Sequence, residues 1–558
     1  EVGPFALVAR AKEDVGRYES VLQSFGYYAG RVTVTIAGHP LDDPTLAETL
    51  AALPANPPVE AKVAVEPGPL YHLGRVAIDG IVPADARAAL GLTPGQPAVA
   101  SEVLAAGARL LAAIEEDGYP LAKVAPPEAT ENPRAHTIDV TFKASVGPPA
   151  VIGSITLAGL NGVNEDFVRN RLLLHSGQRY QPSKIEEARR DLAAMGVFAA
   201  VSVHAGKAVA PDGSIPLTFD FQERDKHAVA VTGAFSTDLG ASLRTSWSDR
   251  NLFGNAEQLD LSAAATGLGG TAVKGLGYDV RARFQKPDFL ERDQTLHADL
   301  AAFKQDLDAY DQRALIAGIG LRRKLSALWT LDFGLSAEEE RISQQGVTRN
   351  YTLLGLPIAA KYDSTGLATL LADPTHGIRA TLSATPMQSL GTRSRSFVIL
   401  QAAGATYLDL GRYWFGTAGR SILALRALVG SVAGAGQFGL PPDQRFYGGG
   451  SATVRGFKYQ SVGPLFPDGN PIGGAAIDAG TIEFRQRLFG DFGAAAFVDA
   501  GQVSADSTPF SGTLRVGAGI GARYYTPIGP VRLDFAVPMN RPPRGDSFEL
   551  YLGLGQAF

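Results

Sequence analysis

From about residue 227 to the end of the chain, hydrophobic and polar positions alternate with a period of two. The clearest runs are residues 280–285, 331–336, 378–383, 514–523 and 531–537. In each run one set of positions is apolar, and the other carries mainly Arg, Asp, Gly and other small or polar residues. Such alternation predicts β-strands with one apolar and one polar face. Residues 227–558 are therefore predicted to be almost entirely β-structure.

Two kinds of β-structure fit this pattern. In a soluble sandwich the apolar faces form the core, whereas in an outer-membrane barrel they meet lipid and the polar faces line a wet lumen. Periodicity alone does not separate the two, but length does. A sandwich of this length would be very large, while sixteen strands leave about 21 residues for each membrane strand and its connection. We therefore predict a 16-stranded antiparallel transmembrane barrel over residues 227–558.

Before residue 227 the pattern changes to helices that alternate with short strands. Helix-forming stretches are predicted at residues 104–117 and 184–195, the second just after a Pro-Ser start signal. The short β-rich runs are residues 75–79, 137–142, 154–157 and 216–221. This half of the chain is therefore predicted to be α+β.

An internal repeat divides the α+β half into modules. Residues 73–80 match residues 152–159 at an offset of 79, and a helix ending in Gly118-Tyr119 matches one ending in Gly196-Val197. A third copy of that helix end is Gly26-Tyr27. Repeats of this kind indicate copies of one structural unit. The predicted domains are modules at residues 1–66, 67–147 and 148–226, followed by the barrel at 227–558.

The first module lacks an opening strand, and the chain begins with Glu1 instead of Met. We expect a mature or trimmed chain whose targeting segment has been removed. The net charge of −5 and the pI near 6.0 argue against nucleic acid as a partner. The absence of Cys excludes a disulfide scaffold and thiol catalysis. No apolar run reaches the ~20 residues of a membrane helix.

The sequence contains no arrangement of residues typical of catalysis. The glycine run at residues 448–450 lacks the Lys-Ser/Thr of a phosphate-binding loop, so a hinge or a close-packed loop is the better interpretation. The eight His are scattered, with no pair at metal-ligand spacing. We find no G-x-S-x-G nucleophile motif. We predict that the protein is not an enzyme and uses no metal or cofactor.

Residues 445–464 contain the signature Val454-Arg455-Gly456-Phe457. Supporting stretches lie at residues 235–240, 371–377, 529–538 and 551–555. Together they resemble the superfamily of outer-membrane assembly proteins that join POTRA modules to a barrel and that includes BamA. Within it the likeness is to the TamA family, the outer-membrane subunits of translocation and assembly modules. Three modules suit that family, since BamA-like relatives have five and two-partner secretion transporters have two.

The resemblance implies a barrel in the bacterial outer membrane, with POTRA modules in the periplasm. It implies assistance in the insertion and folding of nascent outer-membrane proteins and autotransporters, together with a TamB-like inner-membrane-anchored partner. Transport of phospholipid with TamB, through contact with outer-membrane lipid, is a second implied role. A polypeptide-secreting transporter of the two-partner type stays open. It would predict a plug helix before the first module and a steady channel conductance.

In this superfamily the arginine of the signature lies inside the barrel and pairs with acids on nearby strands. The matching residues are Arg455, Glu483 and Asp499, and the predicted clamp includes Gly456 and Phe457. The alternation agrees, because the neighbours of both acids are apolar and would face lipid, which turns both acids to the lumen. An arginine between carboxylates can form charge-assisted bidentate hydrogen bonds. The alternative is that both acids are ordinary residues of a wet lumen.

The barrel is predicted to close where its first strand, residues 228–236, meets its last, residues 548–558. Glycines weaken the last strand, so this seam is predicted to open laterally. An opened seam exposes an unpaired edge, which can template an incoming strand. The predicted residues of the lateral seam are Val229, Val231, Gly233, Leu550, Leu552, Gly553, Gly555 and Phe558.

Overall fold

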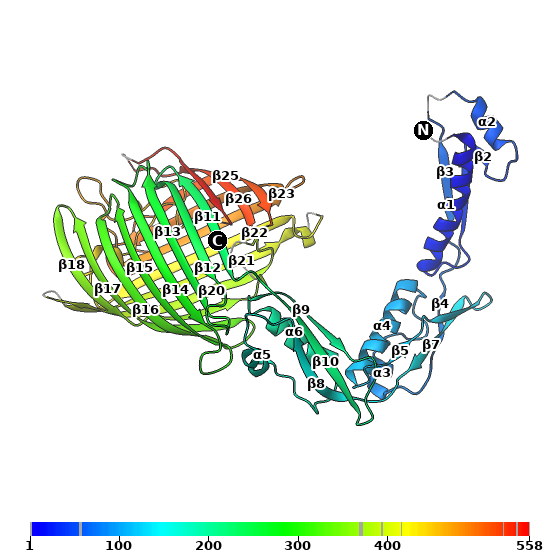
Figure 1. Cartoon of the computed structure of the whole chain (residues 1–558). Helices are drawn as coiled ribbons and strands as arrows, with labels where there is room; N and C mark the ends of the chain where they lie inside the picture. Colours follow the sequence, from blue (N-terminus) through cyan, green and yellow to red (C-terminus); the bar gives the residue numbers. More distant parts are fainter. Residues whose placement is uncertain are drawn as a thin grey trace. The chain divides into compact units, whose positions relative to one another are not determined.

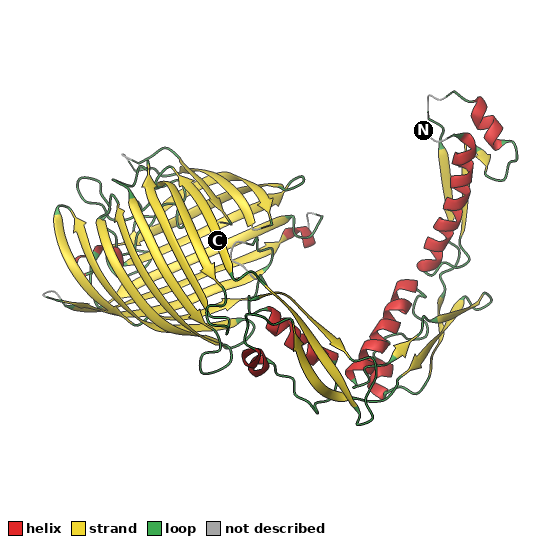
Figure 2. Cartoon of the chain, in the orientation of Figure 1, coloured by secondary structure: helices red, strands yellow, loops and turns green. Residues whose placement is uncertain are grey.

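The structure, a computed structural model, describes residues 3–54, 58–367, 372–391, 394–413, 416–527, 529–542, 545–556 and 558. The chain forms two compact units (Figure 1). The first comprises Glu1–Asn161 and Val168–Glu223, and the second comprises Gly162–Phe167 and Arg224–Phe558. Figure 2 shows the long helices in the first unit and a second unit built almost entirely of strands.

The first module packs two helices against a small sheet whose strand order is β2-β1-β3. Its elements are α1 (Pro4–Ser24), β1 (Arg31–Ile36), β2 (His39–Pro40), α2 (Leu46–Ala52) and β3 (Ala61–Glu66). Alternate residues of β1 are buried. Ile36 packs with Leu46 and Leu50 of α2 and with apolar residues of α1, so this small module has a core of its own.

The second and third modules repeat one arrangement. The second contains β4 (His72–Asp79), α3 (Ala84–Ala88), α4 (Ala100–Glu116), β5 (Lys123–Val124), β6 (Glu128–Asn132) and β7 (Thr137–Ser145). The third contains β8 (Val151–Ala158), α5 (Glu165–Arg171), α6 (Pro182–Ala193), β9 (Phe198–Ala205) and β10 (Ser214–Glu223). In each module the opening strand pairs in parallel with the closing strand, β4 with β7 and β8 with β10. The sequence repeat supplies the two opening strands.

The second unit is a closed barrel in which each strand pairs with the next along the chain and β27 returns to β11. Its strands are β11 (His227–Ser236), β12 (Gly240–Asp249), β13 (Gln258–Leu268), β14 (Gly277–Lys286), β15 (Gln294–Asp306), β16 (Asp311–Lys324), β17 (Trp329–Gln344), β18 (Val347–Gly355), β19 (Ile358–Asp363), β20 (Gly377–Leu390), β21 (Arg395–Asp409), β22 (Ser421–Ala433), β23 (Ala476–Arg487), β24 (Phe492–Ser504), β25 (Arg515–Thr526), β26 (Gly529–Pro538) and β27 (Glu549–Leu554).

The segments β18 and β19 form one strand that is interrupted at Leu356-Pro357. Both segments pair with β17 on one side and with β20 on the other, and the register does not change across the break. Pro357 has no N–H to donate to the ladder, which explains the interruption. The seventeen segments of the described barrel therefore make sixteen antiparallel strands, which confirms the predicted fold class.

The apolar face of the barrel strands points outward and the polar face inward. On β17, Leu331, Phe333 and Leu335 are 36%, 47% and 59% exposed, whereas Glu340 on the opposite face is 3% exposed. A soluble sandwich would bury the apolar face, so this distribution identifies a membrane barrel. Among the described residues, no helix combines the length and the apolar character that crossing a membrane requires.

Candidate functional site

The segment between β22 and β23, residues 434–475, folds back into the barrel, and we call it the folded-back loop. Its middle is buried, with Val454 and Arg455 each 1% exposed. Gly449 and Gly450 have positive φ angles, and a Cβ at Gly449 would lie 2.3 Å from the carbonyl oxygen of Lys458. Only glycine fits such a close approach without strain. The glycine run is therefore part of a close-packed loop.

Arg455 reaches from this loop to carboxylates on β23, β24 and β26. Its Nε and Nη2 donate to the two oxygens of Asp499 at 2.8 and 3.0 Å, and its backbone N–H donates to the same carboxylate at 2.9 Å. Its Nη1 donates to Glu483 at 2.7 Å and to Asp534 at 3.3 Å. The guanidinium carbon lies 3.3 Å from the centre of the Phe497 ring. We call Arg455 and its three carboxylates the arginine clamp.

The clamp is shielded from water. The side chains of Arg455, Glu483 and Asp499 are 2%, 0% and 1% exposed. Burial alone would lower the pKa of Arg455, but the hydrogen bonds and charge of Asp499 and the charges of Glu483 and Asp534 raise it above the ordinary arginine value. The arginine therefore stays charged, and the bidentate bonds fix its orientation as well as its position.

Two more arginines complete the buried cluster. Arg485 Nε donates to Glu483 at 2.8 Å, and Arg523 Nη1 donates to Asp534 at 2.5 Å. Both side chains are at most 1% exposed, while Arg532, 3.4 Å from Asp534, is 14% exposed and lies at the edge. The three buried arginines thus face the three clamp carboxylates, and Arg485 also lies 3.5 Å from Asp373, whose side chain is 8% exposed. A buried carboxylate without such a partner would be strongly destabilising.

The sequence predicts three of these residues as members of the site and not the others. The structure brings Arg455, Glu483 and Asp499 into direct contact. It adds Asp534, Arg485 and Arg523, which had been assigned to no site. A signal was present for Arg485, because it stands two residues after Glu483 on the same face of the strand. Which residues of distant strands meet, however, depends on the closure of the barrel.

The tip of the folded-back loop touches the backbone of the barrel wall. Gly456 has a φ of +88°, and a Cβ there would lie 2.7 Å from the carbonyl carbon of Val537. The Gly456 N–H donates to the hydroxyl of Tyr551 on β27 at 3.2 Å. Phe457 is 4% exposed and packs with Val454 and Val462. Gly456 and Phe457 thus seat the loop beside the arginine.

Gly517 on β25 makes room for this tip, because a Cβ at Gly517 would lie 1.9 Å from the Arg455 carbonyl oxygen. We expect Gly517→Ala to push the loop off the wall at a cost of about 1–3 kcal/mol, the usual range for overpacking. Limited proteolysis of residues 448–463 in the folded barrel measures the displacement. The matched control is Gly480→Ala on β23, where the nearest atom would be 3.6 Å away. Equal protease resistance in both variants would contradict the close approach.

β11 and β27 close the barrel through a short ladder. Phe235 lies opposite Leu552 and Ser236 lies opposite Tyr551, whereas β11 and β12 share ten register pairs. Two backbone N–H groups extend the contact, from Thr237 to the Leu550 carbonyl at 3.1 Å and from Leu550 to the Thr237 hydroxyl at 3.0 Å. The closing contact is therefore much shorter than its neighbours.

Most of the predicted seam residues lie beside this contact and not in it. Leu552 has a register partner across the seam, but Val229, Val231 and Gly233 pair only with β12 among the described residues. Leu550 and Gly553 pair with β26, and Leu550 also contacts Thr237. A cavity of about 600 Å³ lies next to the unpaired part of β11, lined on both sides of the seam.

The prediction that the last strand runs to Phe558 is wrong. β27 ends at Leu554, and Gly555 follows with a φ of +84°. The Gly555 N–H donates to the carbonyl oxygen of Pro530 at 2.8 Å, on the β26 side. Positive φ is incompatible with continuing the strand, so the chain turns there. Gly555 therefore ends the strand that it was predicted to weaken.

Beyond Gly555 the chain turns to the polar face of the barrel. The Gln556 side chain accepts from Arg523 at 3.1 Å and donates to Asp373 at 2.8 Å. The Phe558 ring stacks on Tyr407, with ring centres 6.5 Å apart, and Tyr407 is 2% exposed. Phe558 is thus not a residue of the seam ladder. Asp373 belongs to the stretch 371–377, of which residue 371 lies outside the described residues.

Two regions of the chain match protein families. Residues 251–558 match the Omp85 superfamily domain, and residues 150–224 match the surface antigen variable number repeat, a POTRA family. The chain is 22% identical over 563 residues to the outer membrane protein assembly factor BamA of Neisseria meningitidis serogroup B, covering 89% of this chain and 68% of that protein. It is 21% identical over 521 residues to BamA of Nitratidesulfovibrio vulgaris, covering 89% and 63%. The chain thus spans about two thirds of the length of these relatives.

Solved structures give the same picture of the fold. BamA from Haemophilus ducreyi lacking POTRA domains 1–3 matches with a TM-score of 0.68 at 16% identity, over 87% of this chain and all of that one. CdiB from Acinetobacter baumannii matches with a TM-score of 0.54 at 12% identity, over 88% and 91%. At these identities the likeness shows the fold alone.

Proposed function

Because the chain belongs to the Omp85 superfamily, we propose that it inserts and folds nascent outer-membrane β-barrel proteins at the seam between β11 and β27. A barrel of this superfamily with a POTRA domain implies the outer membrane. The observation that carries the proposal is the short seam. Two register pairs join β11 to β27, and the rest of the β11 edge has no partner among the described residues.

An unpaired edge offers a row of N–H and C=O groups to another strand. A client strand that pairs with β11 would gain main-chain hydrogen bonds in sequence-independent fashion, which suits a protein that handles many clients. Outward-facing Val229 and Val231 are 74% and 66% exposed, so the lipid side of this edge is apolar. A client strand would therefore pair with β11 and enter the lipid in the same step.

The folded-back loop favours insertion over steady conduction. It occupies the barrel interior, and Arg455 fixes it to strands β23, β24 and β26. A polypeptide-secreting transporter of the two-partner type is the competing function, and the CdiB likeness supports the shared fold only. A transporter requires this loop to leave the lumen.

Reconstitution separates the two functions. The full chain in liposomes should raise the yield of a folded outer-membrane barrel from a urea-unfolded client, measured by its heat-dependent mobility on gels. Planar-bilayer recordings should give no steady open channel. Liposomes without the protein set the spontaneous folding rate. A steady conductance without any gain in client folding would favour the transporter.

We further propose that the partner is a TamB-like protein and that the modules, placed in the periplasm, hold its binding surface. The signature at Val454–Phe457 and its supporting stretches, which resemble the TamA family, motivate this assignment within the superfamily. Autotransporters are the proposed clients. Phospholipid transport with the same partner is the alternative role, and it would leave client folding unchanged when the chain is removed from the liposomes.

The modules should fold without the barrel. Residues 1–226 alone should be soluble and α+β by circular dichroism, because each module sheet packs on its own helices and the second has a core that includes Leu110, Ile114 and Phe142. This fragment should capture a TamB-like protein from membrane extracts. The control is residues 227–558 folded in detergent. An unfolded fragment, or capture by the barrel alone, would contradict the assignment of partner binding to the modules.

A further inference from the structure

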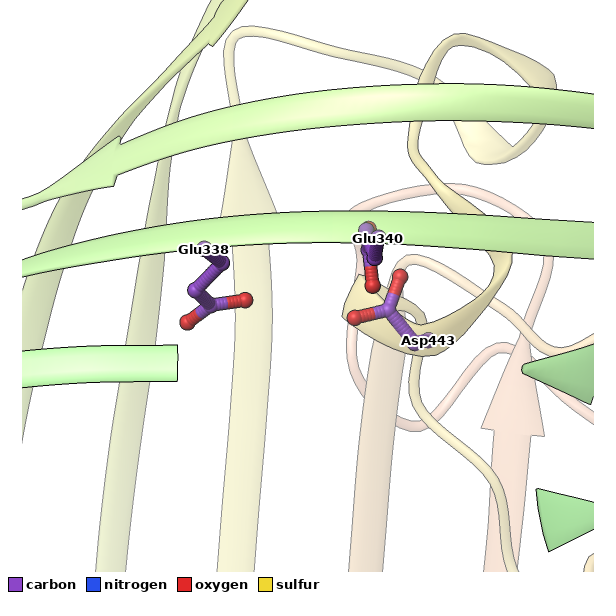
Figure 3. Close-up of side chains that lie close together, drawn as sticks. All are labelled: Glu338, Glu340 and Asp443. Carbon is purple, nitrogen blue, oxygen red and sulfur yellow. The ribbon is translucent and has the colours of Figure 1, made fainter. Parts of the chain in front are cut away.

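Three carboxylates meet inside the barrel, away from the arginine clamp. Glu338 and Glu340 stand on the lumen face of β17, and Asp443 belongs to η3 (Pro442–Gln444) near the start of the folded-back loop. One oxygen of each lies within 4.8 Å of the others. Figure 3 shows the carboxylates of Glu340 and Asp443 turned toward each other, with Glu338 on the same strand.

Side-chain amides of glutamine donate a hydrogen bond to one oxygen of each carboxylate. Gln312 Nε2 donates to Glu340 Oε2 at 2.7 Å. Gln444 Nε2 donates to Asp443 Oδ2 at 2.6 Å and to Glu338 Oε2 at 3.3 Å. Ligating carboxylates are typically oriented by such outer hydrogen bonds. We call the second oxygen of each carboxylate, which these amides do not hold, its inner oxygen.

Two of these inner oxygens are buried without a partner. Glu340 is 3% exposed, and its Oε1 has no hydrogen-bond partner in the described part of the protein; the same is true of Asp443 Oδ1. Buried polar atoms are satisfied in the great majority of cases, and each exception calls for an explanation. Glu340 is more than nine-tenths buried, and its carboxylate, with one oxygen unpartnered, is turned toward that of Asp443. This arrangement indicates that a further group binds between the two carboxylates.

No cationic side chain in the described part of the chain serves as that group. Within the described ranges, none of the three acids forms an ion pair with Lys, Arg or His. The neighbouring Arg445 donates to the Leu440 and Ile472 carbonyls and to the Gln344 side chain. Burial raises the pKa of Asp443, so a proton shared between Asp443 and Glu340 is the competing explanation.

We propose that Glu338, Glu340 and Asp443 bind Ca²⁺. The ligand set is all oxygen, which suits hard cations and not the metals that prefer nitrogen or sulfur. The three ligand oxygens lie within 4.8 Å of one another, close enough to share one ion, and Ca²⁺ accepts such oxygens at about 2.3–2.6 Å in a flexible geometry. Mg²⁺, with bonds of about 2.0–2.1 Å, demands near-ideal octahedral geometry, so carboxylates from two separate segments suit the more flexible Ca²⁺ better.

The bound ion ties the start of the folded-back loop to β17. Arg455 fastens the tip of the same loop to β23, β24 and β26, far along the strand order. The two attachments are chemically independent, one made by a guanidinium and the other by a cation that calcium chelators remove. Calcium would therefore control the freedom of the loop start without touching the clamp.

The test measures Ca²⁺ bound to the full chain in detergent micelles by equilibrium dialysis, after removal of divalent ions with EDTA. Wild type should bind one more Ca²⁺ than the isosteric double variant Glu340→Gln/Asp443→Asn. The single variant Glu340→Gln should lower the affinity at least ~10-fold, since changes in outer partners alone cost 10–100-fold. Ca²⁺ should also slow proteolysis of residues 434–447 in wild type, and the double variant should lose this protection.

Glu339→Gln is the matched control, because Glu339 is exposed on the opposite face of the same strand. It should bind Ca²⁺ as wild type does. Heat-dependent mobility on gels confirms that each barrel is folded. The proposal is overturned if wild type and the double variant bind equal numbers of Ca²⁺ ions. It is also overturned if the wild-type loop is as sensitive to protease in Ca²⁺ as it is in EDTA. That result is expected if Asp443 and Glu340 share a proton instead of binding an ion.

Discussion

Replacing Arg455 with alanine should detach the folded-back loop from the barrel wall while the strands stay closed. The change removes the only loop residue of the clamp and leaves Asp499, Glu483 and Asp534 without it, each at most 1% exposed. Removing one partner of a buried ion pair costs about 3–5 kcal/mol. The backbone pairs of the strand ladders do not include Arg455, so most of the loss should fall on the loop.

Two readouts measure the loss. Protease cleavage of residues 448–463 should rise strongly in the folded variant, and client insertion should fall. Arg283→Ala is the control, because its ion pair with Asp299 has the arginine 56% exposed and such pairs contribute about 0–1 kcal/mol. Arg455→Lys keeps the charge but loses the planar guanidinium. Its protease cleavage and its client insertion should therefore lie between those of wild type and Arg455→Ala. Unchanged cleavage and insertion in Arg455→Ala would remove the clamp from the mechanism.

The alternation of residues along a strand predicted which side chains face the lumen, and little more. Glu483 and Asp499 were placed correctly because Ile482, Phe484 and Val498 are apolar, and the structure leaves these three exposed outside. Alternation does not tell which lumen residues meet. Asp534 joins Arg455 because β26 lies two strands from β24 in the closed barrel, a relation that only the strand order supplies.

The end of the last strand shows where periodicity fails. Phe548, Leu550, Leu552, Leu554 and Phe558 keep strand spacing, so the pattern predicts one strand to the last residue. Other contacts end the strand earlier, because Gln556 donates a hydrogen bond to Asp373 and the Phe558 ring stacks on Tyr407. These partners lie more than 150 residues away in sequence, and no local sequence pattern indicates them. The acidic group at Glu338, Glu340 and Asp443 was missed for the same reason.

The seam and the clamp are mechanically connected. Tyr551 pairs with Ser236 across the seam, and its hydroxyl accepts the N–H of Gly456, the residue next to Arg455. A loop held by the clamp therefore supports β27 from inside. Each hydrogen bond of the short ladder contributes about 0.5–1.5 kcal/mol net, so the closed seam rests on few interactions. Opening it requires the loss of only that ladder and of the contacts around Thr237.

Locking this ladder should abolish client insertion. Phe235 and Leu552 are register partners whose outward side chains are 43% and 44% exposed. Opposed residues in antiparallel strands have Cα atoms about 4.5–5.5 Å apart, within the range of a disulfide. The chain has no native Cys, so Phe235→Cys/Leu552→Cys creates one defined cross-link. A cysteine in place of Val231, four residues away, would be roughly 13 Å out of register and should not form it.

In the oxidised double variant β27 cannot part from β11, and insertion should fall to the rate of protein-free liposomes; reduction should restore it. The control keeps the substitution Leu552→Cys but places the second cysteine on β26, as Leu533→Cys/Leu552→Cys, which locks a pair that does not need to part. This control should insert clients equally well oxidised and reduced. If the locked seam inserts clients as fast as the reduced one, lateral opening is not the route. The modules or a local thinning of the bilayer would then have to carry the client into the membrane.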